Sequence, residues 1–112
     1  MYNSSTAVAQ PLQSFSSASI TSSYQAIGTP LVYPARIVYI TNNSTQDITL
    51  SWDGINDHDY IPHGVVREYD VGSMRGSAPA LDIPKGINFY AKGTAGTGSI
   101  YVTAISAYTP QP

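Results

Sequence analysis

The sequence contains no cysteine and very little charge, and each absence excludes a class of protein. Without cysteine the chain cannot form a disulfide, a thiolate zinc site, an iron–sulfur cluster or a thiol nucleophile. Charged residues make up 11% of the chain, against about 25% in an ordinary soluble domain. The formal net charge of −2 provides no basic surface for nucleic acid. The low charge indicates a surface covered by protein partners or kept soluble by neutral polar side chains.

Long apolar segments are also missing. No apolar run approaches the ~20 residues that a transmembrane helix requires, so we expect no membrane partner. The first residues lack the basic and apolar regions of a secretory signal peptide. We therefore expect synthesis in the cytoplasm.

Charge is unevenly distributed along a chain whose 112 residues suffice for a single domain. All charged side chains lie between Arg36 and Lys92. Residues 1–17 are rich in Ser, Gln and Ala, and we interpret them as an extended N-terminal arm preceding one domain at 18–112. The arm is either a disordered tail or a segment that docks on a neighbouring subunit through Leu12, Phe15 and Tyr2. Because a solvated tail usually keeps some charge, its absence here is consistent with docking.

The rest of the sequence has the pattern of short β-strands. Apolar residues alternate with polar ones over 46–52 and 87–92, and 36–41 is a dense β-branched run. Turn signals recur every 8 to 12 residues, and no segment has helical periodicity. The pattern predicts an all-β fold, an antiparallel β-sandwich or jelly-roll-like barrel of seven or eight short strands. The Asn-rich segment 42–45 predicts a turn that joins 36–41 and 46–52 in a β-hairpin.

Two strands carry apolar groups on both faces. In the last strand Ile100 and Val102 point one way, while Tyr101 and Ile105 point the other. In the run 36–41, Tyr39 and Ile40 lie on opposite faces. A sheet with one solvated face should be polar on that face, so we expect another subunit to cover part of the surface. The predicted interface residues are Leu12, Phe15, Tyr39, Tyr101, Ile105 and Tyr108.

No combination of residues predicts catalysis, a cofactor or a metal site. Asp53, Asp57 and Asp59 form the main acidic cluster, but the glycine and the distant glutamate of an EF-hand are not at their required positions. A calcium ion there remains an alternative to Asx turns, in which the carboxylates bind backbone N–H groups. His58 and His63 could serve zinc chemistry or a small hydrolase only with further partners, and turn histidines are the simpler interpretation.

Nine tyrosines and one tryptophan raise the alternative of a carbohydrate-binding module of a fibre or adhesin. Trp52, however, has the same phase as Ile48 and Leu50 and is predicted to lie in the core. Tyrosines suit protein interfaces, because each buries a large area and keeps a polar end.

Two stretches of the sequence resemble small virion structural proteins of tailed bacteriophages. They are residues 40–47 (ITNNSTQD) followed by 51–62 (SWDGINDHDYIP), and residues 83–102 (IPKGINFYAKGTAGTGSIYV). The resemblance implies a non-enzymatic β-sandwich of the head or neck of a virion. It implies a decoration protein or a head–tail connector component, made in the host cytoplasm. Its partners would be copies of itself and other virion proteins, such as the major capsid protein or the portal.

Overall fold

The computed structural model describes residues 6–71 and 82–108, and these form nine β-strands and one 3-10 turn, Ser17–Ser19. The strands are β1 (Thr6–Ala9), β2 (Gln13–Ser16), β3 (Gln25–Ala26), β4 (Ile37–Ser44), β5 (Ile48–Ser51), β6 (Asp59–Ile61), β7 (Val66–Asp70), β8 (Tyr90–Gly93) and β9 (Gly98–Tyr108). Within this part of the chain no helix is long and apolar enough to cross a membrane.

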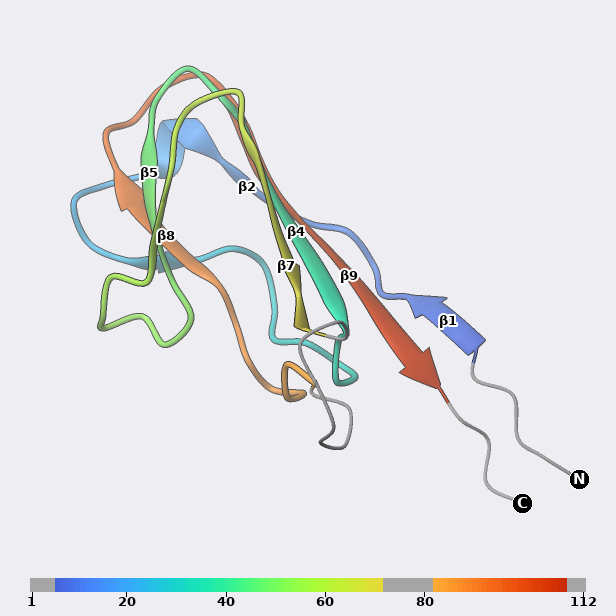
Figure 1. Cartoon of the computed structure of the whole chain (residues 1–112). Helices are drawn as coiled ribbons and strands as arrows, with labels where there is room; N and C mark the ends of the chain where they lie inside the picture. The colour runs from blue at the N-terminus through green and yellow to red at the C-terminus, as the bar shows by residue number, and fades with distance from the viewer. Residues whose placement is uncertain (1–5, 72–81, 109–112) are drawn as a thin grey trace, which may run out of the picture.

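The strands form two antiparallel sheets that pack face to face (Figure 1). The five-stranded sheet has the order β1-β9-β4-β7, with β2 also paired to β9. The four-stranded sheet has the order β3-β8-β5-β6. The predicted all-β sandwich is confirmed, and the additional strands come mainly from the segment that we interpreted as an arm.

The core lies between the two sheets because alternate residues of each central strand point inward. In β4, Val38 and Ile40 are fully buried, while Ile37 and Tyr39 alternate with them and are half-buried on the other face. Phe89 is the largest fully buried side chain of those that the structure describes. The buried hydrophobic residues form one cluster: Ile20, Ile27, Leu31, Ala35, Val38, Ile40, Ile48, Leu50, Ile61, Ile83, Phe89, Ala91, Ile100, Val102 and Ala104.

The predicted hairpin between 36–41 and 46–52 is wrong. β4 pairs with β7 and β9, whereas β5 pairs with β6 and β8 in the other sheet. β4 continues through Ser44, and Asn42 is buried in it rather than lying in a turn. The Asn42 amide donates to the carbonyls of Gln46 and Ile61, at 3.0 and 2.9 Å. These bonds stabilise the corner at which the chain crosses between the sheets.

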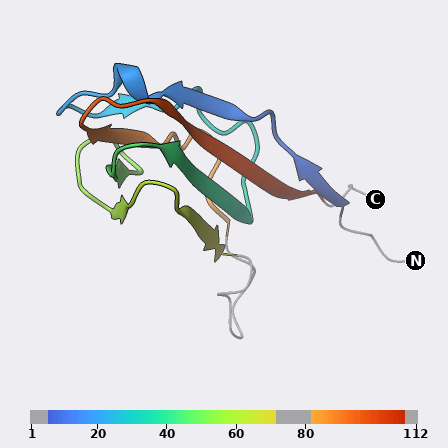
Figure 2. The same cartoon turned by 90° about the horizontal axis from the view of Figure 1, so that it is seen from above.

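Residues 6–16 form one edge of the five-stranded sheet, paired with β9 of the same chain (Figure 2). Ala9 lies opposite Ile105 and Gln13 opposite Val102. The arm therefore has one more residue than β9 over this interval, which is a β-bulge around Pro11. The bulge reverses the alternation, because Val8 faces inward before it and Phe15 faces inward after it. Because of this reversal, residues 6–16 do not show one regular alternation of apolar and polar residues in the sequence.

Candidate functional site

The register of β4 and β9 brings three predicted interface residues onto one surface. Ile37 lies opposite Ile105, Tyr39 opposite Thr103, and Thr41 opposite Tyr101. Their sequence neighbours on the other face of each strand lie in the core, so all six point away from it. We call this surface the outer face of the five-stranded sheet, and its central residues are Ile37, Tyr39, Thr41, Tyr101, Thr103 and Ile105. Each of them is half-buried in the single chain.

Acidic side chains border the outer face on one side only. Strand β7 places Glu68 beside Tyr39 and Asp70 beside Ile37. The Tyr39 hydroxyl lies 3.4 Å from a Glu68 carboxylate oxygen, and the negative charge of Glu68 raises the pKa of Tyr39. The centre of the face therefore presents neutral apolar and hydroxyl groups, with negative charge along β7.

The other predicted interface residues lie elsewhere. Phe15 packs against the core of its own chain and is partly buried there. Its position follows from the bulge, which directs it inward opposite Ile100. Leu12 is 61% exposed in the bulge itself. The backbone of Tyr108 pairs with Thr6, and its side chain lies outside the part that the structure describes.

The sequence did not identify Ile37, Thr41 and Thr103 as part of the outer face. Alternation along β9 indicated that Thr103 shares the orientation of Tyr101. Which residues of β4 lie beside it depends on the pairing of strands distant in sequence, and a single sequence carries no signal for that.

The three aspartates of the acidic loop bind different partners. Asp53 forms an Asx turn, in which Oδ1 accepts the N–H groups of Ile55 and Asn56 at 2.8 and 2.9 Å. Asp57 pairs with Lys92 at 3.0 Å and accepts the Tyr24 hydroxyl, while Asp59 accepts the Tyr69 hydroxyl at 2.6 Å and pairs with Arg67 at 2.9 Å. No group of three potential metal ligands lies together among the described residues.

The two histidines contact different residues. The His58 ring accepts the backbone N–H of Trp52 through Nδ1 at 2.9 Å. The His63 ring lies 2.9 Å from Asp47, which also accepts the Tyr60 hydroxyl at 2.6 Å. These bonds to Asp47 lower its pKa to about 2. Each histidine thus has a local structural role next to a strand end.

The carbohydrate alternative depended on an exposed tryptophan or a groove lined by tyrosines. Trp52 packs against the core, edge-to-face with Tyr69 and Phe89 at ring-centroid distances of 5.2 and 5.5 Å. Tyr33 and Tyr60 are about half exposed, at 52% and 54%. They lie on different parts of the chain, one in the loop after Leu31 and the other in β6.

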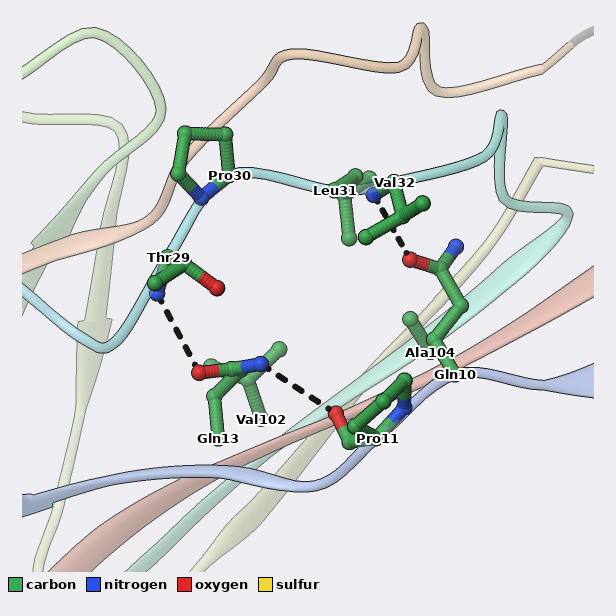
Figure 3. A pocket seen from close by; sticks show the side chains of 9 residues that line it. All are labelled: Gln10, Pro11, Gln13, Thr29, Pro30, Leu31, Val32, Val102 and Ala104. Atoms are coloured by element: carbon green, nitrogen blue, oxygen red, sulfur yellow. Dashed lines mark hydrogen bonds between the residues drawn. The ribbon is translucent and has the colours of Figure 1, made fainter.

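A pocket lies between the bulge and the loop at 29–32 (Figure 3). The side chains of Gln10 and Gln13 reach from the bulge to the loop. Gln10 accepts the N–H of Val32 at 3.0 Å, and Gln13 accepts the N–H of Thr29 at 3.2 Å. The residues lining the pocket include no aromatic ring and no titratable group: Gln10, Pro11, Gln13, Thr29, Pro30, Leu31, Val32, Val102 and Ala104. These glutamines fasten the N-terminal segment to the loop.

No protein-family model, no curated protein and no solved structure matches this chain.

The Asx turn at Asp53 predicts a pH dependence of stability. Its hydrogen bonds with Asn56 and Ile55 lower the pKa of Asp53, so the carboxylate favours the folded state above about pH 4. This contribution is lost as the pH falls through the lowered pKa. Asp53→Asn keeps an acceptor oxygen but does not titrate. We expect a smaller loss of stability in this variant between about pH 5 and pH 2, measured by urea unfolding monitored through Trp52 fluorescence.

Asp47 is unchanged in this variant and keeps its own lowered pKa, so some pH dependence remains. An acid profile of Asp53→Asn that coincides with the unmodified protein's would show that the Asx turn does not couple folding to pH.

Proposed function

We propose that this protein is a non-enzymatic structural subunit that assembles through the outer face of the five-stranded sheet. The observation that carries the proposal is the uncharged centre of this face, where Tyr39, Tyr101 and Ile105 come together across β4 and β9. Aromatic and aliphatic groups in a patch without charge are typical of the centre of protein interfaces.

The proposed setting is the virion of a tailed bacteriophage, as a head–tail connector or neck component or as a capsid decoration protein. The sequence resemblance at 40–62 and 83–102 supports this setting, and the sandwich is compatible with it. In this setting the partners are other copies of the chain and the surrounding shell or portal proteins. The acidic border at Glu68 and Asp70 favours a partner that is neutral or basic opposite β7.

The chain offers a matched pair of variants for a test. Thr103 and Thr49 are half-buried threonines on central strands, one on each sheet, and both point away from the core. Thr103→Asp places a charge at the centre of the proposed interface, whereas Thr49→Asp places it on the opposite side of the sandwich. We expect Thr103→Asp to weaken association with the shell or portal about tenfold or more, because the new carboxylate must lose its water without a partner. Thr49→Asp should bind like the unmodified protein.

Binding is measured by co-sedimentation with purified capsids or portal assemblies, and incorporation by mass spectrometry of purified particles. Absence of the protein from particles would contradict the virion setting. Equal binding by Thr103→Asp and the unmodified protein would contradict the role of the outer face.

A further inference from the structure

The edges of the two sheets differ sharply in how they are protected against pairing with another strand. Soluble proteins protect sheet edges with charged side chains, prolines, bulges or very short strands. The four-stranded sheet ends in β3, which has two residues, and in β6, which has three and begins at Asp59. Strand β7 at one edge of the five-stranded sheet carries Arg67, Glu68 and Asp70. Each of these edges has one of the known forms of protection.

Strand β1 has none of them. It is four residues long, Thr6–Ala9, and contains neither charge nor proline. Its sequence neighbours extend the uncharged region, since residues 1–35 carry no charged side chain. Ala7 and Ala9 are exposed. Strand β1 pairs with β9, and no other strand of the described part of the chain occupies its second edge.

The backbone groups on that free edge can be identified from the register. Gln10 donates its N–H to the Ala104 carbonyl at 3.0 Å, directly after the pair of Ala9 and Ile105. Alternate residues in an antiparallel strand direct their N–H and C=O groups to the same side. Val8 therefore faces β9 like Gln10, whereas the N–H and C=O groups of Ala7 and Ala9 point away from the sheet.

This edge also projects from the body of the molecule. The pairing of β4 with β9 ends at Ile37 and Ile105, so residues 106–108 of β9 continue beside β1 beyond the end of β4. Figures 1 and 2 show β1 and the end of β9 extending away from the rest of the sandwich. The bulge at Pro11 limits the edge on the other side, because proline has no N–H to donate to a strand running past it. The open edge of β1 thus ends at the bulge.

We infer that β1 pairs with β1 of a second copy of this chain, antiparallel and about a two-fold axis at Val8. Ala7 then lies opposite Ala9 of the second copy and exchanges both backbone hydrogen bonds with it. Small side chains face small side chains, and Val8 meets its own counterpart, so the pairing is sterically self-complementary. An isologous contact of this kind closes on itself and yields a dimer.

The distribution of charge favours a second copy of the chain as the partner, and β1 over β7 as the edge that pairs. Joining two β1 strands brings no like charges together, and it leaves Glu68 and Asp70 of each copy on β7, at the far edges of the combined sheet. Joining two β7 strands would instead bring four acidic side chains into one contact, where like charges opposite one another are destabilising. The inference does not depend on the virion setting, and it concerns a different surface from the outer face.

The test uses Ala9→Pro, which removes an N–H that points away from β9 and bonds to none of the described residues, and Ala9→Ser as the matched control that keeps it. Sedimentation equilibrium should show a dimer for the unmodified protein and Ala9→Ser, and a dissociation constant about tenfold or more higher for Ala9→Pro. Thr103→Asp should dimerise normally, which separates this edge from the outer face. A second variant, Ala7→Lys, adds a repelling charge and should have the same effect as Ala9→Pro.

Hydrogen exchange resolved by NMR gives an independent readout. In the dimer the amides of Ala7 and Ala9 should exchange slowly and become fast on dilution, while those of Val8 and Gln10 stay protected in both states. Protected Val8 and Gln10 amides in Ala7→Lys would show that β1 remains folded against β9. A protein that is monomeric at all concentrations would overturn the inference. A dimer unaffected by both variants would also overturn it, whether the dimer formed by exchange of the arm or through another surface. A β1 edge that binds only a different protein would do the same.

Discussion

Gly98→Ala is expected to lower the free energy of unfolding by about 3–4 kcal/mol, more than a glycine substitution in a turn usually costs. Gly98 begins β9 opposite Ser44 and has a φ of +90°. A Cβ atom added there would lie 2.2 Å from the carbonyl oxygen of Asn43, which belongs to the backbone of the neighbouring strand. Since a backbone atom cannot rotate away, β4 and β9 must separate locally. We attribute about 1–2 kcal/mol of the loss to the positive φ and the rest to this collision.

Gly86→Ala is the matched control, because Gly86 also has a φ of +90° but has no atom within 4 Å of an added Cβ. It should lower stability by about 1–2 kcal/mol only, through backbone strain. Both variants are compared with the unmodified protein by urea unfolding, monitored by the fluorescence of Trp52. Equal losses in the two variants would show that the close approach of β4 and β9 at Gly98 does not contribute.

The glycine at position 98 also illustrates what the sequence could and could not predict. The glycines of segment 93–99 are typical of a connection between strands, and the residues after it alternate as in a strand. That Gly98 is needed for a close approach to Asn43 follows only from the pairing of β9 with β4, which are separated by more than fifty residues. Local patterns identify strands, whereas the neighbours of a strand depend on the whole fold.

The same distinction explains the wrong hairpin. Alternation in 46–52 correctly placed Ile48 and Leu50 in the core. It gave no information on whether the preceding strand lay beside them or across from them, because both arrangements bury the same side chains. The two strands within the arm were missed for a different reason. Its bulge shifts the alternation by one residue, so neither β1 nor β2 is long enough to be recognised alone.

For the candidate interface, the sequence contributed the choice of residues and the structure contributed their arrangement. Two-faced apolarity singled out Tyr101 and Ile105, and pairing with β4 placed them beside Tyr39. Phe15 was also chosen for its apolar ring, but its own core provides the contact. An apolar side chain in a segment without charge is therefore compatible with burial in the same chain as well as with an interface.

Asn42→Ala should be the second large loss, about 3 kcal/mol of the free energy of unfolding. Asn42 is fully buried and connects the two sheets, because its amide group on β4 donates to the carbonyl of Ile61 on β6. It also donates to the carbonyl of Gln46, and its Oδ1 accepts the hydroxyl of Ser44 at 2.6 Å. Truncation removes the side-chain donor to the Ile61 carbonyl, whereas the Gln46 carbonyl still accepts the Ser44 hydroxyl at 2.9 Å. An unsatisfied buried group costs about 1–3 kcal/mol before relaxation, and the emptied side-chain volume adds to the loss.

Asn43→Ala is the control, since Asn43 is the next residue of the same strand but is exposed. It should change stability by less than about 0.5 kcal/mol. Asn42→Leu distinguishes the two possible causes of the loss, because leucine restores most of the volume and none of the hydrogen bonds. If the bonds to Ile61 and Gln46 hold the sheets together at this corner, Asn42→Leu remains destabilised in urea unfolding. Recovery of full stability by Asn42→Leu would instead mean that the side chain only fills space, and that apolar packing alone joins the two sheets.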